Sequence, residues 1–194
     1  ELGIAKNTLV LFFSDNGPSG DFPSGSPELR GAKGSVYEGG HKVPAMAWWP
    51  GTIEPGTVSN EPIISIDVMP TLLKIAGAAL PQRPLDGADF SPVLLRRESL
   101  KPRPFYWASL SNHGRRSEAM RDGMWKLVVN HPKARKGSFE NERVELYRLD
   151  QDPSEKTNLA PAEPGRAAAM LTRLKAWYAD TQRTATPQPG GWPR

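Results

Sequence analysis

The sequence predicts an α/β fold in its first part and a small antiparallel sheet with a C-terminal helix in its second part. Two continuous apolar runs, at residues 8–13 and 43–49, are typical of strands buried on both faces of a sheet. Short strand-like segments follow residue 104, and an amphipathic helical pattern comes after them. We therefore expect domains at residues 1–100 and 101–186, with a tail at residues 187–194.

The first half of the chain places polar loops between its apolar elements. The run from Thr8 to Phe13 ends in the turn-forming residues Ser14-Asp15-Asn16-Gly17. Residues 18–28 and 31–40 are rich in glycine and polar residues and are expected to be irregular. The second run, Val43 to Trp49, is closed by a Pro-Gly pair, which ends the predicted strand.

One helix is expected after these strands, in the sequence SIDVMPTLLKIAG at residues 65–77. Ser65 or Asp67 can cap its first turn, and Pro70 falls early enough to be tolerated. Gly77 is a typical residue for its C-terminal stop. The apolar residues Val68, Met69, Leu72, Leu73 and Ile75 are expected to form its buried face.

The second half begins after a proline-rich connection at residues 78–104. Its predicted strands lie in the segments PFYWAS, EAMRDG, MWKLVVN and VELYRL. Asp122-Gly123 between two of them indicates a hairpin, and residues 133–141 read as a polar loop. The last element, about Gly165 to Thr181, has helical spacing of Met170, Leu171, Leu174, Trp177 and Tyr178.

Composition restricts the classes of partner. The 194 residues include no cysteine, which excludes disulfides, thiolate metal sites and a cysteine nucleophile within the chain. No apolar run approaches the ~18 residues of a membrane-spanning helix, so no membrane partner is expected. The net charge of +4 fits either a solvated basic face or attraction of an anionic substrate. No aromatic-interleaved basic motif is present, so no nucleic acid partner is expected.

Asp15 and Asn16 are candidate metal ligands. They follow a predicted strand, and ligands of α/β sheets gather beyond the carboxyl ends of strands. A carboxylate beside a carboxamide oxygen suits a hard cation such as Ca²⁺ or Mg²⁺. The tripeptide Asp-Asn-Gly is also ordinary turn chemistry, so both interpretations stay open at this point.

Lys33 is a candidate anion-binding residue. It lies among the small residues of Gly31-Ala32-Lys33-Gly34-Ser35, which leave its ammonium accessible to an oxyanion. The spacing of a phosphate-binding P-loop is absent, and an ordinary exposed loop lysine is the alternative. Glu38 is expected to pair with a neighbouring cation.

Six segments together resemble the C-terminal part of type I sulfatases, the arylsulfatase-like members of the alkaline phosphatase superfamily. In chain order they are LVLFFSDNG, LRGAKGSVYEGGHKVPAMAWWPG, SIDVMPTLLKIAG, LDGADFSPVLL, AMRDGMWKLV and ELYRLDQDPSEKTNLA. The resemblance implies a partial alkaline-phosphatase-like α/β sandwich domain, followed by a four-stranded antiparallel sheet with one packed helix. It also implies a periplasmic or secreted parent protein.

The resemblance assigns roles to the candidate residues. Asp15 and Asn16 match metal ligands of the family, for Ca²⁺ or Mg²⁺, and Lys33 matches the lysine that holds a sulfate oxygen. His113, in an arginine-rich loop, could touch the substrate, although an exposed loop histidine is the simpler interpretation. The implied substrate is a sulfate ester, and the basic loop suggests a sulfated glycan.

The nucleophile motif of the family is absent from these residues. Sulfatases carry formylglycine in a C/S-x-P-x-R motif, which occurs nowhere in the 194 residues. We therefore expect this chain alone to be inactive. Because apolar surface of the predicted sheet is left uncovered, we also expect the chain to self-associate or to be marginally stable. A phosphoric or phosphonic monoester hydrolase of the same superfamily and a non-catalytic truncated domain are the alternatives.

Overall fold

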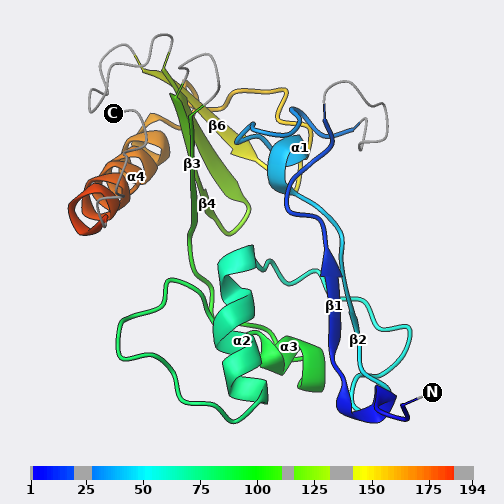
Figure 1. Ribbon diagram of the computed structural model, residues 1–194. Helices are drawn as coiled ribbons and strands as arrows, with labels where there is room; N and C mark the ends of the chain where they lie inside the picture. The colour runs from blue at the N-terminus through cyan, green and yellow to red at the C-terminus, as the bar shows by residue number, and fades with distance from the viewer. Residues whose placement is uncertain (1, 20–27, 111–115, 132–141, 186–194) are drawn as a thin grey trace. The chain divides into compact units, whose positions relative to one another are not determined.

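The computed structural model describes residues 2–19, 28–110, 116–131 and 142–185 (Figure 1). Contacts divide the chain into two compact units, one formed by residues 1–15 and 43–102 and the other by residues 16–42 and 103–194. Residues 16–42, which include the glycine-rich segment 28–42, therefore group with the C-terminal part of the chain. The predicted division into domains at residue 100 stays a prediction.

The first unit contains a two-stranded ribbon preceded by a short 3-10 helix, η1 (Ala5–Asn7). Its strands are β1 (Val10–Phe13) and β2 (Ala45–Trp48), which pair antiparallel with Val10 opposite Trp48. The strands lie where the sequence predicts them, but the expected burial is wrong: Phe12 is 63% and Trp48 is 52% exposed. Within the described residues each strand has one neighbouring strand, so the ribbon is not part of a larger sheet there.

The helices of the first unit are η2 (Ser65–Asp67), α2 (Val68–Ile75) and α3 (Ser91–Arg96). The predicted helix is confirmed, and Gly77 after it has a positive φ of 64°. Its buried residues, however, are Pro70 and Thr71 and not Met69 and Leu72, which are 50% and 41% exposed. The proline-rich connection contains α3, which sequence analysis did not predict.

A buried aspartate links α2 to the chain before α3. The carboxylate of Asp67 accepts hydrogen bonds from the backbone N–H of Ile64 at 2.9 Å and of Ala88 at 2.8 Å. The hydroxyl of Thr71 accepts another from the N–H of Phe90 at 2.9 Å. These contacts satisfy backbone donors in a segment that lacks regular structure.

The second unit is built on a four-stranded antiparallel sheet in the order β3-β4-β5-β6. Its strands are β3 (Phe105–Leu110), β4 (Arg116–Asp122), β5 (Trp125–Asn130) and β6 (Arg143–Arg148). The predicted hairpin is confirmed, since Asp122 faces Trp125 across the turn and Gly123 has a positive φ of 59°. All four predicted strands are present.

Both faces of this sheet are covered (Figure 1). The long helix α4 (Pro164–Thr184), predicted from its periodicity, packs on one face. That face forms the core of Met120, Leu127, Val129, Leu146, Ala167, Met170 and Leu174. On the other face, Ala119, Val128 and Tyr147 pack with Val36 of the glycine-rich segment. The sheet thus supports that segment directly.

Residues 31–40 were expected to be irregular, and this expectation is only partly correct. The glycine-rich segment ends in a short helix, α1 (Glu38–His41), whose residues Glu38, Gly39 and Gly40 are buried. Among the described helices of both units, none combines the length and apolar character needed to cross a membrane.

Candidate functional site

The predicted metal ligands lie in the bend that follows β1. Asp15 is exposed, Asn16 is half-buried and Gly17 is buried. No described residue forms a hydrogen bond or ion pair with the carboxylate of Asp15. Asp15 and Asn16 follow β1, the strand after which the sequence places them.

Two backbone hydrogen bonds join the residues after this bend to the glycine-rich segment. The N–H of Gly17 donates to the carbonyl oxygen of Gly40 at 2.8 Å, and the N–H of Lys33 donates to that of Pro18 at 2.9 Å. The approach requires glycine, because a Cβ atom at Gly17 would lie 1.8 Å from the carbonyl oxygen of Gly39. Segments from two separate sequence motifs therefore lie side by side.

The glycine-rich segment folds tightly on itself around Lys33. The N–H of Gly39 donates to the carbonyl oxygen of Arg30 at 2.7 Å, and the N–H of Ser35 donates to that of Ala32 at 2.9 Å. A Cβ atom at Gly40 would lie 2.0 Å from the carbonyl oxygen of Ser35. From β3, the hydroxyl of Ser109 donates to the carbonyl oxygen of Gly34 at 2.8 Å, which fixes the turn next to Lys33.

Lys33 presents its ammonium on the surface of this turn. The side chain is exposed, and no carboxylate among the described residues pairs with it. An unpaired ammonium on a well-fixed backbone is suited to binding an oxyanion as a point charge.

The described residues offer oxygen ligands of the type that a hard divalent cation prefers, but too few of them to form a complete site. Asp15 and Asn16 supply carboxylate and carbonyl oxygens, which Ca²⁺ and Mg²⁺ prefer. Nowhere in residues 2–19, 28–110, 116–131 and 142–185 do three or more Asp, Glu or His side chains gather into a metal site. His113 lies outside the described residues.

Behind the Lys33 turn, Lys126 is completely buried on β5. Its ammonium lies 2.8 Å from Oε1 of Glu38, 2.9 Å from Oε1 of Glu155 and 3.2 Å from Nε2 of His41. We call these four residues the Lys126 cluster. Oε2 of Glu155 also accepts a hydrogen bond from the backbone N–H of Glu38 at 2.6 Å, at the start of α1. The expectation that Glu38 pairs with a cation is confirmed.

Burial and the positive charge of Lys126 together shift the pKa values in the Lys126 cluster. Burial alone would raise the pKa of Glu38, but the charge and the hydrogen bond of Lys126, together with His41 and Arg121, hold the pKa below its usual value. Burial raises the pKa of Glu155, against the opposing attraction of Lys126. Burial and the repulsion of Lys126 lower the pKa of His41 to about 4, so this ring is neutral at pH 7. It stacks on Trp107 at 4.3 Å between ring centroids.

A second polar cluster fixes the other end of the segment. Oε2 of Glu145, on β6, accepts hydrogen bonds from the hydroxyls of Tyr37 and Tyr147, each at 2.6 Å. The guanidinium of Arg30 donates to the Tyr147 hydroxyl at 2.8 Å and lies over the Tyr37 ring at 3.9 Å. Burial and the hydrogen bond to Glu145 raise the pKa of Tyr37 to about 12, so its hydroxyl stays a proton donor. We call Arg30, Tyr37, Glu145 and Tyr147 the Glu145 cluster.

The sequence predicted that Glu38 pairs with a cation, but neither cluster as a whole was predicted. Their signal is a charged residue at an inward position of an apolar strand, as for Lys126 in MWKLVVN and Glu145 in VELYRL. Such residues are rarely buried unless they are paired. The strand pattern alone therefore indicated buried partners, although not which residues they are.

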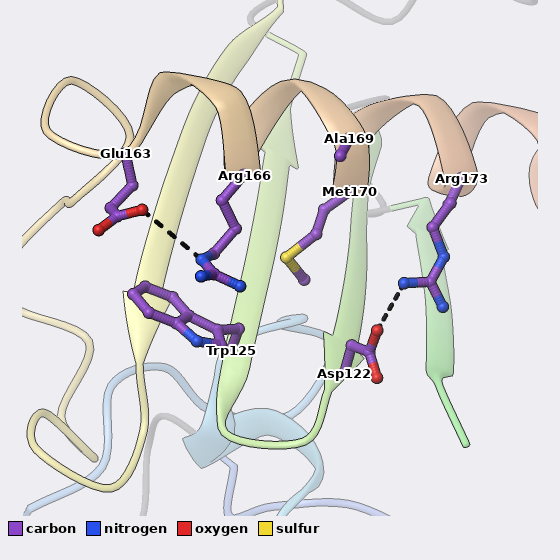
Figure 2. A pocket seen from close by; sticks show the side chains of 7 residues that line it. All are labelled: Asp122, Trp125, Glu163, Arg166, Ala169, Met170 and Arg173. Carbon is purple, nitrogen blue, oxygen red and sulfur yellow. Dashed lines mark hydrogen bonds and ion pairs between the residues drawn. The ribbon is translucent and has the colours of Figure 1, made fainter. Parts of the chain in front are cut away.

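A separate pocket of about 340 Å³ lies between α4 and the β4–β5 turn (Figure 2). Arg166 lies over the ring of Trp125 at 4.3 Å and pairs with Glu163 at 3.6 Å. Arg173 pairs with Asp122 at 2.5 Å. Each arginine has a carboxylate partner, and none of the predicted site residues lines this pocket. The positive charges of this pocket are therefore paired with carboxylates of the same chain.

Comparisons with known proteins agree with the motifs. A family model described as Sulfatase matches residues 1–78. Arylsulfatase A from Homo sapiens is 38% identical over 192 residues, which cover 90% of this chain and 38% of that protein. A protein named Sulfatase from Formosa agariphila is 34% identical over 186 residues, which cover 90% of this chain and 34% of that protein.

A solved structure shares the fold. The crystal structure of Ps i-CgsB has a TM-score of 0.75 and 27% identity over 89% of this chain and 37% of that chain. The same protein is also solved in complex with k-i-k-neocarrahexaose. This chain spans less than two fifths of the length of each of these proteins. The predicted fold class and the predicted resemblance are confirmed, because these matches support an arylsulfatase-like sulfatase of the alkaline phosphatase superfamily.

Proposed function

We propose that this chain forms part of the active site of a sulfate ester hydrolase. In this proposal Asp15 and Asn16 bind a divalent metal ion, Ca²⁺ or Mg²⁺, and Lys33 binds an oxygen of the sulfate group. One observation carries it: the N–H of Lys33 donates to the carbonyl oxygen of Pro18, so the Lys33 turn is attached to the segment that follows Asn16.

The chemistry of each residue supports its role. Lys33 offers a compact ammonium without a carboxylate partner among the described residues, and such a charge stabilises a developing or resident oxyanion. The metal ion, when bound, would supply further charge stabilisation at the sulfate oxygens. Asp15 and Asn16 hold two of the oxygen ligands, and the remaining ligands and the formylglycine nucleophile are expected from residues outside this chain.

The substrate class is proposed to be a sulfated glycan. The related protein Ps i-CgsB is solved with a neocarrahexaose, and the basic residues of this chain would favour a polyanion. His113 and the loops at residues 19–27 and 109–116 are proposed to contact the sugar. No role for nucleic acid or a membrane is proposed.

Hydrolysis of 4-nitrophenyl sulfate by the full-length protein, with Ca²⁺ or Mg²⁺ added, tests the function. We expect turnover that a chelator abolishes and that Lys33→Ala lowers by about 10²–10³-fold in kcat/KM. Lys42→Ala removes an exposed lysine at the end of the same segment and is the matched control, with unchanged kinetics expected.

Two results would contradict the proposal, and each would favour one of its alternatives. A higher kcat/KM for 4-nitrophenyl phosphate than for the sulfate would favour the monoester hydrolase alternative. No turnover of either ester by the full-length, metal-loaded protein would favour a non-catalytic domain. The 194-residue chain assayed alone is expected to be inactive, because it lacks the nucleophile motif.

A further inference from the structure

We propose that Lys126 is a positioning residue for both arms of the proposed sulfate site, the Lys33 turn and the Asn16–Gly17 segment. This inference rests on the proposed function for the identity of the site, and on the contacts of α1 for the mechanism of positioning.

The location of Lys126 is unusual for a lysine. It lies in β5 between the apolar residues Trp125 and Leu127, and its side chain is 0% exposed. A buried ion pair is often no more stabilising than apolar residues of similar volume, because both charges lose their hydration. A directional contact from Lys126 does, however, fix where its partners lie, which an apolar side chain would not.

The partners of Lys126 come from segments far apart in the sequence. Glu38 and His41 are the first and last residues of α1, and Glu155 belongs to the turn region after β6. Glu155 has a positive φ of 53°, which is uncommon for a residue other than glycine. Its carboxylate binds both Lys126 and the backbone N–H of Glu38. One ammonium therefore attaches both ends of α1 to the sheet.

Helix α1 in turn contacts both arms of the site. The carbonyl oxygen of Gly40 accepts the hydrogen bond from Gly17, next to Asn16. The N–H of Gly39 donates to Arg30, and a Cβ atom at Gly40 would lie 2.9 Å from the carbonyl oxygen of Ala32, next to Lys33. Because these contacts are backbone against backbone, a shift of α1 must move one arm or both.

A charge-neutral double variant separates positioning from stability. Lys126→Met with Glu38→Gln removes the ion pair and leaves no charge on either residue. Without Lys126, Glu155 loses the attraction that opposes the effect of burial on its pKa, so its neutral, protonated form is favoured and the variant should fold. Leu174→Ala is the matched control, since Leu174 is equally buried on the opposite face of the same sheet and lies outside the site. Both variants are made in the full-length protein.

Two quantities are compared between the double variant and Leu174→Ala, under conditions in which both have lost the same thermal stability. The first is hydrogen exchange at the amides of Gly17, Lys33 and Gly39, which are hydrogen-bonded in the site. The second is the inhibition constant of inorganic sulfate. The double variant is expected to exchange at least about tenfold faster and to bind sulfate at least about tenfold more weakly, as small displacements in such sites do. Leu174→Ala should change both by less than about twofold.

The outcomes distinguish the two proposals. Exchange at these amides that is unchanged in the folded double variant, or equally raised by Leu174→Ala, overturns the positioning role. Faster exchange in the double variant, with no sulfate binding by the unsubstituted protein, supports the attachment of α1 by Lys126 but overturns the assignment of the site to sulfate.

Discussion

The ammonium of Lys126 lies 2.8 Å from Oε1 of Glu38, and both side chains are buried. The pair joins the middle of the four-stranded sheet to the helix that ends the glycine-rich segment. One face of the sheet is therefore a platform for the segment that carries Lys33, while α4 covers the other face. The C-terminal sheet contributes to the site by holding this segment in place.

Replacement of Lys126 alone should be strongly destabilising. Lys126→Met leaves Glu38 buried without its counter-ion, and we expect a loss of about 3–5 kcal/mol in the free energy of unfolding. Urea unfolding followed by circular dichroism measures it. Lys156→Met removes an exposed lysine beside Glu155 and should stay within about 0.5 kcal/mol. A loss below about 1 kcal/mol for Lys126→Met would be inconsistent with a buried ion pair.

Stability should fall when the pH is lowered from 6.5 to about 4 because of His41. Burial and the charge of Lys126 lower the pKa of His41 from 6.5 to about 4, with Glu38 opposing and Arg121 adding to the shift. The unfolded chain therefore binds a proton before the folded chain does, so stability is complete above pH 6.5 and is lost as the pH falls. The loss is at most about 3 kcal/mol.

The control for this prediction is His41→Gln, which cannot titrate. Urea unfolding between pH 4 and 7 should show a steeper fall for the unsubstituted chain than for the variant. The pKa of Glu38 is lowered by Lys126 and that of Glu155 is raised by burial, so these two carboxylates change stability with pH in opposite directions, and both are present in both proteins. Parallel stability curves would mean that His41 is not held in its neutral form.

Replacement of the two tyrosines of the Glu145 cluster should affect stability in a non-additive way. Tyr37→Phe and Tyr147→Phe each remove one of the two hydrogen bonds to Oε2 of Glu145, at a cost of about 1–3 kcal/mol. The double variant removes both and should cost about 0.5–3 kcal/mol more than the sum. Tyr37→Phe combined with Met170→Ala, which lies on the α4 face, should be additive. Additivity of the tyrosine pair would show that Glu145 is satisfied without them.

The 194-residue chain should self-associate through its β1–β2 ribbon. Val10, Phe12, Met46 and Trp48 lie on one face of the ribbon as cross-strand pairs and are 45–63% exposed. Phe12→Ser with Met46→Ser should shift the chain toward the monomer in sedimentation velocity at equal concentration. Val58→Ser, at a single apolar residue that is 90% exposed, is the control and should have no effect. Equal association of both variants would exclude the ribbon.

Local signals in the sequence predicted the elements of the second unit. The short strand-like segments, the Asp122-Gly123 turn and the helical spacing of Met170, Leu171 and Leu174 are each defined over a few residues, and the structure confirms them. Helix α3 was missed because it is only six residues long and contains Pro92, in a segment that reads as loop. The expected burial of β1 was wrong because burial depends on neighbouring elements, and β2 is its only partner within the described residues.

The candidate site was predictable only in part, for a related reason. Asp15, Asn16 and Lys33 belong to short motifs that can be read locally. The contacts that fix them join residues far apart: Lys126 is 88 residues from Glu38, and Tyr37 is 108 residues from Glu145. No local pattern specifies which buried lysine meets which carboxylate, although a charge inside an apolar strand indicates that a partner exists.

Calorimetric titration of inorganic sulfate into the full-length protein, loaded with Ca²⁺, tests most directly whether the Lys33 turn binds sulfate. We predict that Lys33→Ala weakens sulfate binding by at least about tenfold, as expected when one charged hydrogen-bonding group is removed. Lys42→Ala should bind as the unsubstituted protein does. Equal sulfate affinity for the unsubstituted protein and Lys33→Ala would contradict the assignment of Lys33 to the substrate.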